Sequence, residues 1–183
     1  DWANGFIALK YDSSQIPNTP ATSNSRFYVD RGYLTMGNLK AFPAYATFGQ
    51  LYVPFGTFSS YMISSPLTQS IFSTRARAVV LGYAQPDSEG LTAQVYGFNG
   101  DSSTHHTNNI NDLGANLDYS FNNKNWSIST GAGVIANVAD SKGMQDTGAS
   151  PAVFSGFSHQ TPINPEPEIL HRQVPGVAAH LNV

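Results

Sequence analysis

The chain has 183 residues, and only 11% of them are charged, against about 25% in an ordinary soluble domain. The net charge of −3 gives no basic surface for nucleic acid, and the absence of cysteine excludes disulfide bonds and thiolate metal sites. No run approaches the roughly 20 apolar residues that a membrane helix needs. The composition therefore fits neither a helical membrane protein nor a charge-covered cytosolic one.

Alternating apolar and polar residues predict an all-β fold, because successive side chains of a strand point to opposite faces. The clearest case begins at residue 113, where Leu117 and Tyr119 fall on one face and Asn116 and Asp118 on the other. In chain order, the pattern predicts strands at about 4–12, 26–38, 44–54, 74–85, 91–99, 113–122, 125–138 and from about 176.

The connections between these strands alternate in length. The long ones are rich in Ser, Thr, Asn, Gly and Pro, and the short ones carry turn residues. This alternation is typical of an antiparallel, up-and-down transmembrane β-barrel of the outer-membrane type. A soluble β-sandwich or a lectin-like jelly roll is the alternative fold, although long and short connections would not alternate so regularly along its chain. The expected long outer loops are 13–25, 55–73, 100–112 and 139–175, and the short turns are 39–43, 86–90 and 122–125.

Residues 1–183 are expected to form a single domain that is a fragment of a larger barrel. The chain opens without a signal peptide, and the stretch after residue 176 resembles a strand cut short. A half-barrel has two open edges, which lipid does not tolerate, so we expect the isolated chain to need detergent. In this interpretation the apolar faces contact lipid, while Asn116 and Asp118 face a watery lumen.

Five stretches between Phe27 and about Gly148 resemble a known family. They are "FYVDRGYLTMGN", "ATFGQLYVPFGTFSSYMISSPLT", "VYGFNGD", "NDLGANLDYSF" and "IANVADSKGMQD". They are similar to the LbtU-type siderophore porins, outer-membrane barrels of Gram-negative bacteria whose namesake is a receptor for the siderophore legiobactin. The resemblance implies a larger barrel in the outer membrane that takes up small solutes, including a ferric siderophore. It implies no particular ligand residues.

Charged residues within predicted strands are the first candidates for a site. Arg75 and Arg77 share one face of their strand and are costly at the membrane midplane, so they should line the lumen or its outer rim. Paired guanidiniums bind carboxylates well, as in an anionic siderophore. The alternative is a salt-bridge ladder in the barrel wall, in which Asp30 pairs with one of the two arginines.

The long connection that begins at residue 55 is unusually apolar. Phe55, Phe58, Tyr61 and Met62 would be costly if left in water. The segment is therefore expected to fold into the pore as a constriction or to form an aromatic platform for a ligand. Alternatively, the strands extend past the membrane and these side chains pack against neighbours. Pro54 should lie at a strand end.

The sequence predicts neither a metal site, nor a cofactor, nor an enzyme. His105, His106, His159 and His171 lack zinc-type spacing and are expected in surface loops. No motif such as GxSxG marks a nucleophile, so a membrane-anchored hydrolase is a minor alternative. The expected partners are the lipid bilayer and a ferric siderophore. A general diffusion porin and a soluble binding module are the rival functions.

Overall fold

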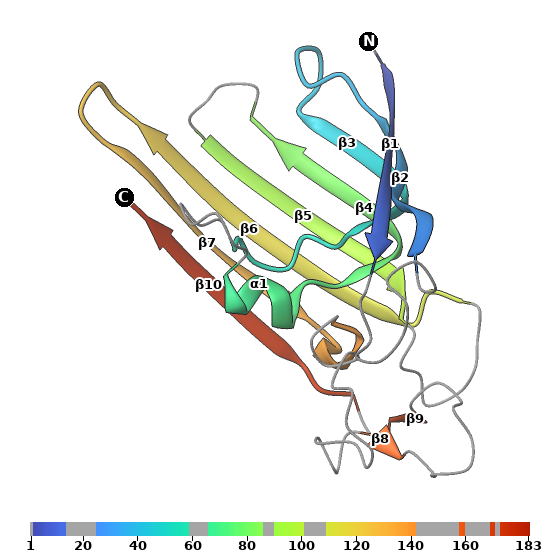
Figure 1. Cartoon of the computed structure of the whole chain (residues 1–183). Coiled ribbons are helices and arrows are strands. Elements are labelled where there is room, and N and C mark those ends of the chain that lie inside the picture. The colour runs from blue at the N-terminus through green and yellow to red at the C-terminus, as the bar shows by residue number, and fades with distance from the viewer. Residues whose placement is uncertain are drawn as a thin grey trace.

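The computed structural model is all-β and contains one open, eight-stranded antiparallel sheet (Figure 1). The strands of this sheet are β1 (Ala3–Ser13), β2 (Ser25–Met36), β3 (Ala44–Tyr52), β4 (Arg75–Ala84), β5 (Gly90–Asn99), β6 (Asp112–Asn122), β7 (Ser127–Ile135) and β10 (Gly176–Asn182). The smaller elements are α1 (Leu67–Phe72), η1 (Val138–Asp140), β8 (Ser158–His159) and β9 (Ile169–Leu170). The structure describes residues 2–13, 25–58, 66–85, 90–100, 109–141, 158–159, 169–170 and 173–183. None of the helices within these ranges is long and apolar enough to cross a bilayer.

The strand order confirms the predicted all-β class and the up-and-down arrangement. Neighbours in sequence are neighbours in the sheet, from β1 to β7, and β10 then pairs with β7. The predicted short turn after β6 is present, where Asn123 and Trp126 exchange backbone hydrogen bonds of 2.7 and 3.3 Å. The strands β1 and β10 form the two edges and carry the two ends of the chain in Figure 1.

Several elements differ from the prediction. β7 ends at Ile135 rather than at residue 138, because the Asn137 side chain accepts a hydrogen bond from the Ala139 backbone N–H and starts the short helix η1. α1 lies within a connection that was predicted to be a loop, as do β8 and β9. β3 ends at Tyr52, two residues before Pro54, which fits the expected role of this proline.

The two faces of the sheet have different surroundings. Along β4, Ala76, Ala78 and Val80 are buried, whereas Leu81 and Tyr83 are exposed. We call the face with the buried side chains the inner face and the opposite one the outer face. The register extends this division to the neighbouring strands, because directly paired residues point to the same side.

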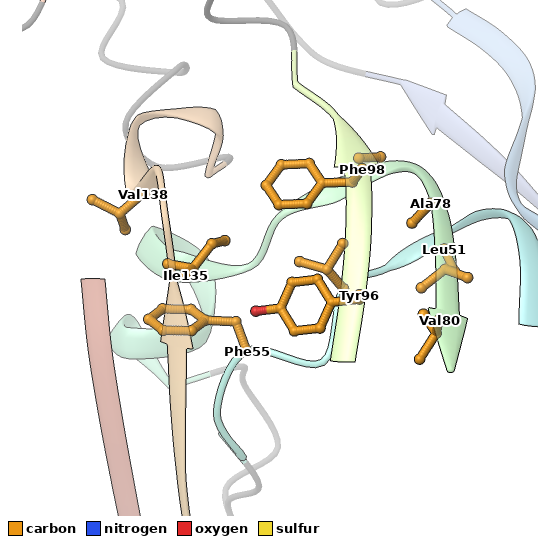
Figure 2. Packing of buried hydrophobic residues seen from close by; sticks show 10 residues of the cluster. Leu51, Phe55, Ala78, Val80, Tyr96, Phe98, Ile135 and Val138 are labelled. Atoms are coloured by element: carbon orange, nitrogen blue, oxygen red, sulfur yellow. The ribbon is translucent and has the colours of Figure 1, made fainter. Parts of the chain in front are cut away.

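The inner face is covered by the segment that follows β3. In Figure 1 this segment crosses over the sheet, and Gly56 within it lies against Ala178 of β10. Val53 and Phe55 are buried against side chains of β4, β5 and β7, and Figure 2 shows Phe55, Tyr96 and Ile135 facing one another. Together they form the hydrophobic core: Leu51, Val53, Phe55, Ala76, Ala78, Val80, Tyr96, Phe98, Ile135 and Val138.

Glycines on the inner face allow large side chains to lie flat across neighbouring strands. The ring of Tyr45 lies over Gly82, and the ring of Tyr96 lies over Gly114 and donates a hydrogen bond of 3.1 Å to the Val134 carbonyl. A methyl group at either glycine would overlap the tyrosine ring. These contacts pack β3 against β4 and β5 against β6 on the inner face.

Candidate functional site

The first part of the candidate site is the segment 53–58, which narrows the space above the inner face. Phe55 is 4% exposed, and Phe58 packs against the same core. Gly56 adopts φ +73°, a left-handed conformation that favours glycine, and it lies against Ala178 of β10. Tyr61 and Met62, the other expected members of this apolar segment, lie outside the described residues. The segment is therefore anchored to the sheet by Phe55 and Gly56.

The second part is a charged cluster around Asp30. Arg75 donates a hydrogen bond of 3.1 Å to Asp30 Oδ1, which is one of the two pairings that the sequence left open. Arg31 Nε lies 3.5 Å from Asp30 Oδ2, and the Tyr52 hydroxyl donates to Asp30 Oδ1 at 3.4 Å. One carboxylate thus faces two guanidiniums, which leaves the cluster with one net positive charge.

A β-bulge explains how neighbouring residues reach the same cluster. Ala8 pairs with Arg31 and Leu9 pairs with Val29, so Asp30 is the extra residue of β2. A strict period of two would send Asp30 and Arg31 to opposite faces, but a bulge adds a residue and re-aims its side chain. The Gln50 side chain stabilises the bulge, because it donates hydrogen bonds to the backbone carbonyls of Val29 and Asp30.

Aromatic rings surround the same two arginines. The Arg31 guanidinium lies 5.3 Å from the ring centre of Phe6 and 5.9 Å from that of Tyr52. The Arg75 guanidinium lies 5.4 Å from the ring centre of Tyr28. Distances below about 6 Å permit cation–π attraction. The cluster thus combines positive charge with aromatic surface.

Arg77 lies on the same outer face of β4 as Arg75, as their spacing predicted. Both are exposed, and both lie opposite the buried Ala76 and Ala78. In the part of the chain that the structure describes, Arg77 forms no ion pair. A shallow hollow beside it is lined by Phe48, Gln50 and Asn99. The structure therefore does not bring Arg77 into the cluster around Asp30.

The third part of the site is a polar group on the inner face of β6, β7 and β10. Asn116 is buried and donates a hydrogen bond to Asp118 Oδ2. His180 Nε2 lies 3.8 Å from Asp118 Oδ1 and 3.5 Å from Ser129 Oγ. Asp118 and His180 are both paired with Gly131, and a side chain there would overlap them, so this glycine lets the two side chains meet across β7.

This geometry does not form a catalytic triad. Both Ser129 Oγ and Asp118 Oδ1 approach the same nitrogen of His180, whereas a triad needs one partner on each ring nitrogen. His180 Nδ1 has no hydrogen-bond partner within the described ranges. Those ranges also contain no group of three or more His, Cys, Asp or Glu side chains placed to hold a metal ion. His105, His106 and His171 lie outside the described residues, and nothing is described of the His159 side chain.

A further polar network joins the ends of the strands near the long connections. Asp112 at the start of β6 is 2% exposed and accepts a hydrogen bond of 3.3 Å from the Gln173 side chain. Asn137 donates a hydrogen bond of 3.4 Å to Asp140 Oδ2, and Val138 pairs through its backbone N–H with the Val174 carbonyl. These contacts hold η1 and the start of β10 against β6.

The outer face is largely apolar and exposed, but near the long connections it carries Arg75, Arg77, Gln50 and Asn99. A hollow at its centre is lined mainly by alanines and by Leu81, Val95, Leu117 and Val134. Within the described ranges, no second layer covers these side chains. The exposed large apolar residues on this face include Leu34, Met36, Phe48, Leu81, Tyr83, Leu91, Val95, Leu113, Leu117, Tyr119, Phe121, Val134, Val177 and Leu181.

Comparison with known proteins identifies relatives that are much longer than this chain. A UPF0422 protein of Coxiella burnetii is 42% identical over 148 residues, which is 80% of this chain and 31% of the relative. UPF0422 proteins of Legionella pneumophila strains Lens and Philadelphia 1 are 40% and 39% identical over 160 residues, which is 85% of this chain and 29% of each relative. The chain therefore spans about a third of the length of these curated relatives. Their shared name specifies neither an activity nor a ligand.

No protein-family model matches the chain, and no solved structure matches it. The candidate site is therefore defined by the geometry of this chain alone.

Sequence reasoning did not single out three features of this site. His180 lies on a strand without a motif, although its alternation with Ala178 placed it on one face. The rings of Phe6 and Tyr33 stack with 5.1 Å between their centres. The sequence did not predict this contact, because the two residues lie on different strands. Gly131 and Gly133 could have indicated the site, because glycines at alternate positions of a strand often mark a place where another group packs closely against the backbone.

Proposed function

We propose that this chain is part of an outer-membrane β-barrel through which small solutes, including a ferric siderophore, are taken up. The observation that carries the proposal is the outer face, which exposes large apolar side chains on strand after strand. Contiguous apolar patches of more than a few hundred Å² are rare on soluble monomers. Contact with lipid removes the free-energy cost of exposing such a face to water.

The dimensions of the sheet support this proposal. On β6 the outer-face residues Leu113 to Phe121 cover eight residue steps, about 27 Å along the strand at about 3.4 Å per residue. At a strand tilt of about 40°, this becomes a height of about 21 Å, close to the apolar band of about 25 Å in outer-membrane barrels. Tyr83, Tyr119, Phe121 and Trp126 are exposed at the end of the sheet with the short turns, where aromatic girdles occur.

The polar part of the inner face, beside the hydrophobic core, supports passage of solutes. It carries Asn116, Asp118 and His180, and it is crossed by the anchored segment 53–58. A segment in this position narrows a lumen without filling it. The open edges β1 and β10 require further strands in lipid, since unpaired backbone groups are costly there. The greater length of the relatives provides room for such strands.

Two other functions make different predictions. A soluble β-sandwich would need a second sheet over the outer face, and β8 and β9 are only two residues each. A general diffusion porin fits the same geometry but needs no dedicated ligand. The siderophore part of the proposal comes from the resemblance to the LbtU-type porins and from the net positive charge around Asp30.

The proposal is tested by conductance and binding measured on the same protein. The protein that contains this chain is refolded in detergent, inserted into planar bilayers, and titrated with ferric siderophores while tyrosine fluorescence is followed. Stepwise conductance with saturable binding is expected. Conductance without saturable binding would leave a general porin, and a monodisperse protein that needs no detergent would refute the barrel.

A further inference from the structure

We propose that the inner face of β1, β2 and β3 binds planar aromatic carboxylates, with Arg31 holding the carboxylate and the rings of Phe6 and Tyr33 packing against the aromatic ring of the ligand. This inference deepens the proposed function by naming a class of solute, and it rests on that function only for the direction of transport. Binding itself is measurable without transport.

The first observation is the state of the Arg31 guanidinium. It shares Asp30 with Arg75, and the shorter contact of 3.1 Å belongs to Arg75. Arg31 Nε approaches Asp30 at 3.5 Å but makes no hydrogen bond in the described part of the chain. A guanidinium has five N–H donors in a planar fork that matches a carboxylate. The Nε atom is buried, but the Arg31 side chain is 41% exposed, so its terminal Nη groups remain for a ligand.

The second observation is the line of aromatic rings next to Arg31. Phe6 lies 5.3 Å from the Arg31 guanidinium and stacks on Tyr33 with an interplanar angle of 23°. Ala8 is the direct partner of Arg31, and Phe6 is the direct partner of Tyr33, so these side chains occupy the same face two residues apart. The positive charge and the apolar ring surface are thus adjacent on one face of the sheet.

The third observation is a hollow beside the two rings. It lies toward the short turn between β2 and β3, and it is lined by Phe6, Tyr33, Thr35, Tyr45 and Asn4 among others. Thr35 is hydrogen-bonded to Thr47 at 3.0 Å, and the Tyr45 hydroxyl accepts a hydrogen bond of 2.6 Å from Gln94. These bonds fix the walls of the hollow, so its shape exists before a ligand enters.

The chemistry of this arrangement selects one kind of solute. Aromatic faces favour a flat ring through stacking, and the adjacent guanidinium favours a carboxylate through paired hydrogen bonds. A neutral ring loses the charge-assisted bonds, and a saturated ring loses the stacking. A planar ring that carries a carboxylate satisfies both parts of the site at once.

Three small probes separate these contributions. Benzoate carries the ring and the charge, cyclohexanecarboxylate carries the charge without the flat ring, and benzyl alcohol carries the ring without the charge. Binding to the refolded protein in detergent is measured by saturation-transfer NMR and calorimetry. Benzoate is expected to bind at least about tenfold more tightly than benzyl alcohol, because it keeps the charge-assisted bonds. It is expected to bind several-fold more tightly than cyclohexanecarboxylate, because it keeps the flat ring for stacking.

Variants assign the site to its residues. Arg31→Gln should weaken benzoate binding by about tenfold or more, and Arg31→Lys, which keeps the charge but loses the fork, should weaken it less. Phe6→Leu should reduce the preference for benzoate over cyclohexanecarboxylate. Arg77→Gln makes the same charge change on the outer face and should leave binding unchanged.

The outcomes separate this inference from the proposed function. Equal binding of benzoate and cyclohexanecarboxylate, or equal loss in Arg31→Gln and Arg77→Gln, would overturn the inference while bilayer conductance still supports a pore. Selective benzoate binding that depends on Arg31, in a protein without conductance, would support the site and refute the pore.

Discussion

Gly56 offers a direct test of how the segment 53–58 is fixed to the sheet. Its φ of +73° is unfavourable for any residue with a side chain, and a Cβ there would lie 2.8 Å from the Cβ of Ala178. We therefore expect Gly56→Ala to destabilise the protein through two separable effects. One effect is local to the backbone, and the other depends on the neighbour in β10.

The magnitudes of both effects follow from the geometry. The left-handed conformation costs an alanine about 1–2 kcal/mol. Carbon atoms pack best at about 3.5–4.0 Å, so a separation of 2.8 Å forces a shift of roughly 1 Å, and overpacking of this kind costs about 1–3 kcal/mol. Gly56→Ala is therefore expected to lower the free energy of unfolding by about 2–5 kcal/mol.

A double-mutant cycle separates the two effects. Ala178→Gly removes the overlapping methyl group, so the combined variant should keep only the backbone cost, with a coupling energy of about 1–3 kcal/mol. Urea unfolding in detergent, followed by far-ultraviolet circular dichroism, measures these differences. Gly5→Ala is the matched control, because a Cβ at Gly5 meets nothing within 4 Å. Equal losses in Gly5→Ala and Gly56→Ala, or no coupling with Ala178, would refute the docking of this segment.

Three further changes test other parts of the structure. Gly131→Ala should lower the free energy of unfolding by about 1–3 kcal/mol, because the new methyl group overlaps Asp118, and urea unfolding would show no loss if the two strands do not approach as described. Asp30→Asn should destabilise the protein more in low salt than in high salt, since two guanidiniums lose their shared carboxylate; a loss that is independent of salt would contradict the ion pairs. Leu117→Lys should reduce folding into lipid vesicles by about 2–4 kcal/mol, whereas Ser120→Lys on the inner face should have little effect, and equal effects would argue against a lipid-facing surface.

The strands could be predicted from the sequence because each has one apolar and one polar face. The same pattern placed Asn116 and Asp118 together on the inner side, where the register aligns them with Gly133 and Gly131. Asp30 was expected to pair with either Arg75 or Arg77, and it pairs with Arg75. These successes share one cause, which is the period of two in a strand.

The remaining features depend on contacts that no local pattern encodes. The bulge opposite Ala8 and Leu9 has no distinctive residue, yet it brings Arg31 next to Asp30. The apolar character of the segment that contains Phe55 indicated that it is buried, but only the structure gives its path toward β7 and β10. His180 contacts Asp118 because the intervening strand β7 carries Gly131 between them. Local patterns do not predict this contact, because β6 and β10 are far apart in sequence.

The central claim is that the outer face contacts lipid, and that the polar part of the inner face beside Asn116, Asp118 and His180 contacts water. The chain contains no cysteine, so single cysteines can be introduced and labelled with a nitroxide without background. Labels at Leu81, Leu117 and Val134 on the outer face, and at Gln94 and Ser120 on the inner face, are compared in lipid vesicles. We predict that oxygen, which partitions into lipid, relaxes the outer labels, and that a water-soluble nickel chelate relaxes the inner ones. Access of the nickel chelate to both sets of labels would contradict the account.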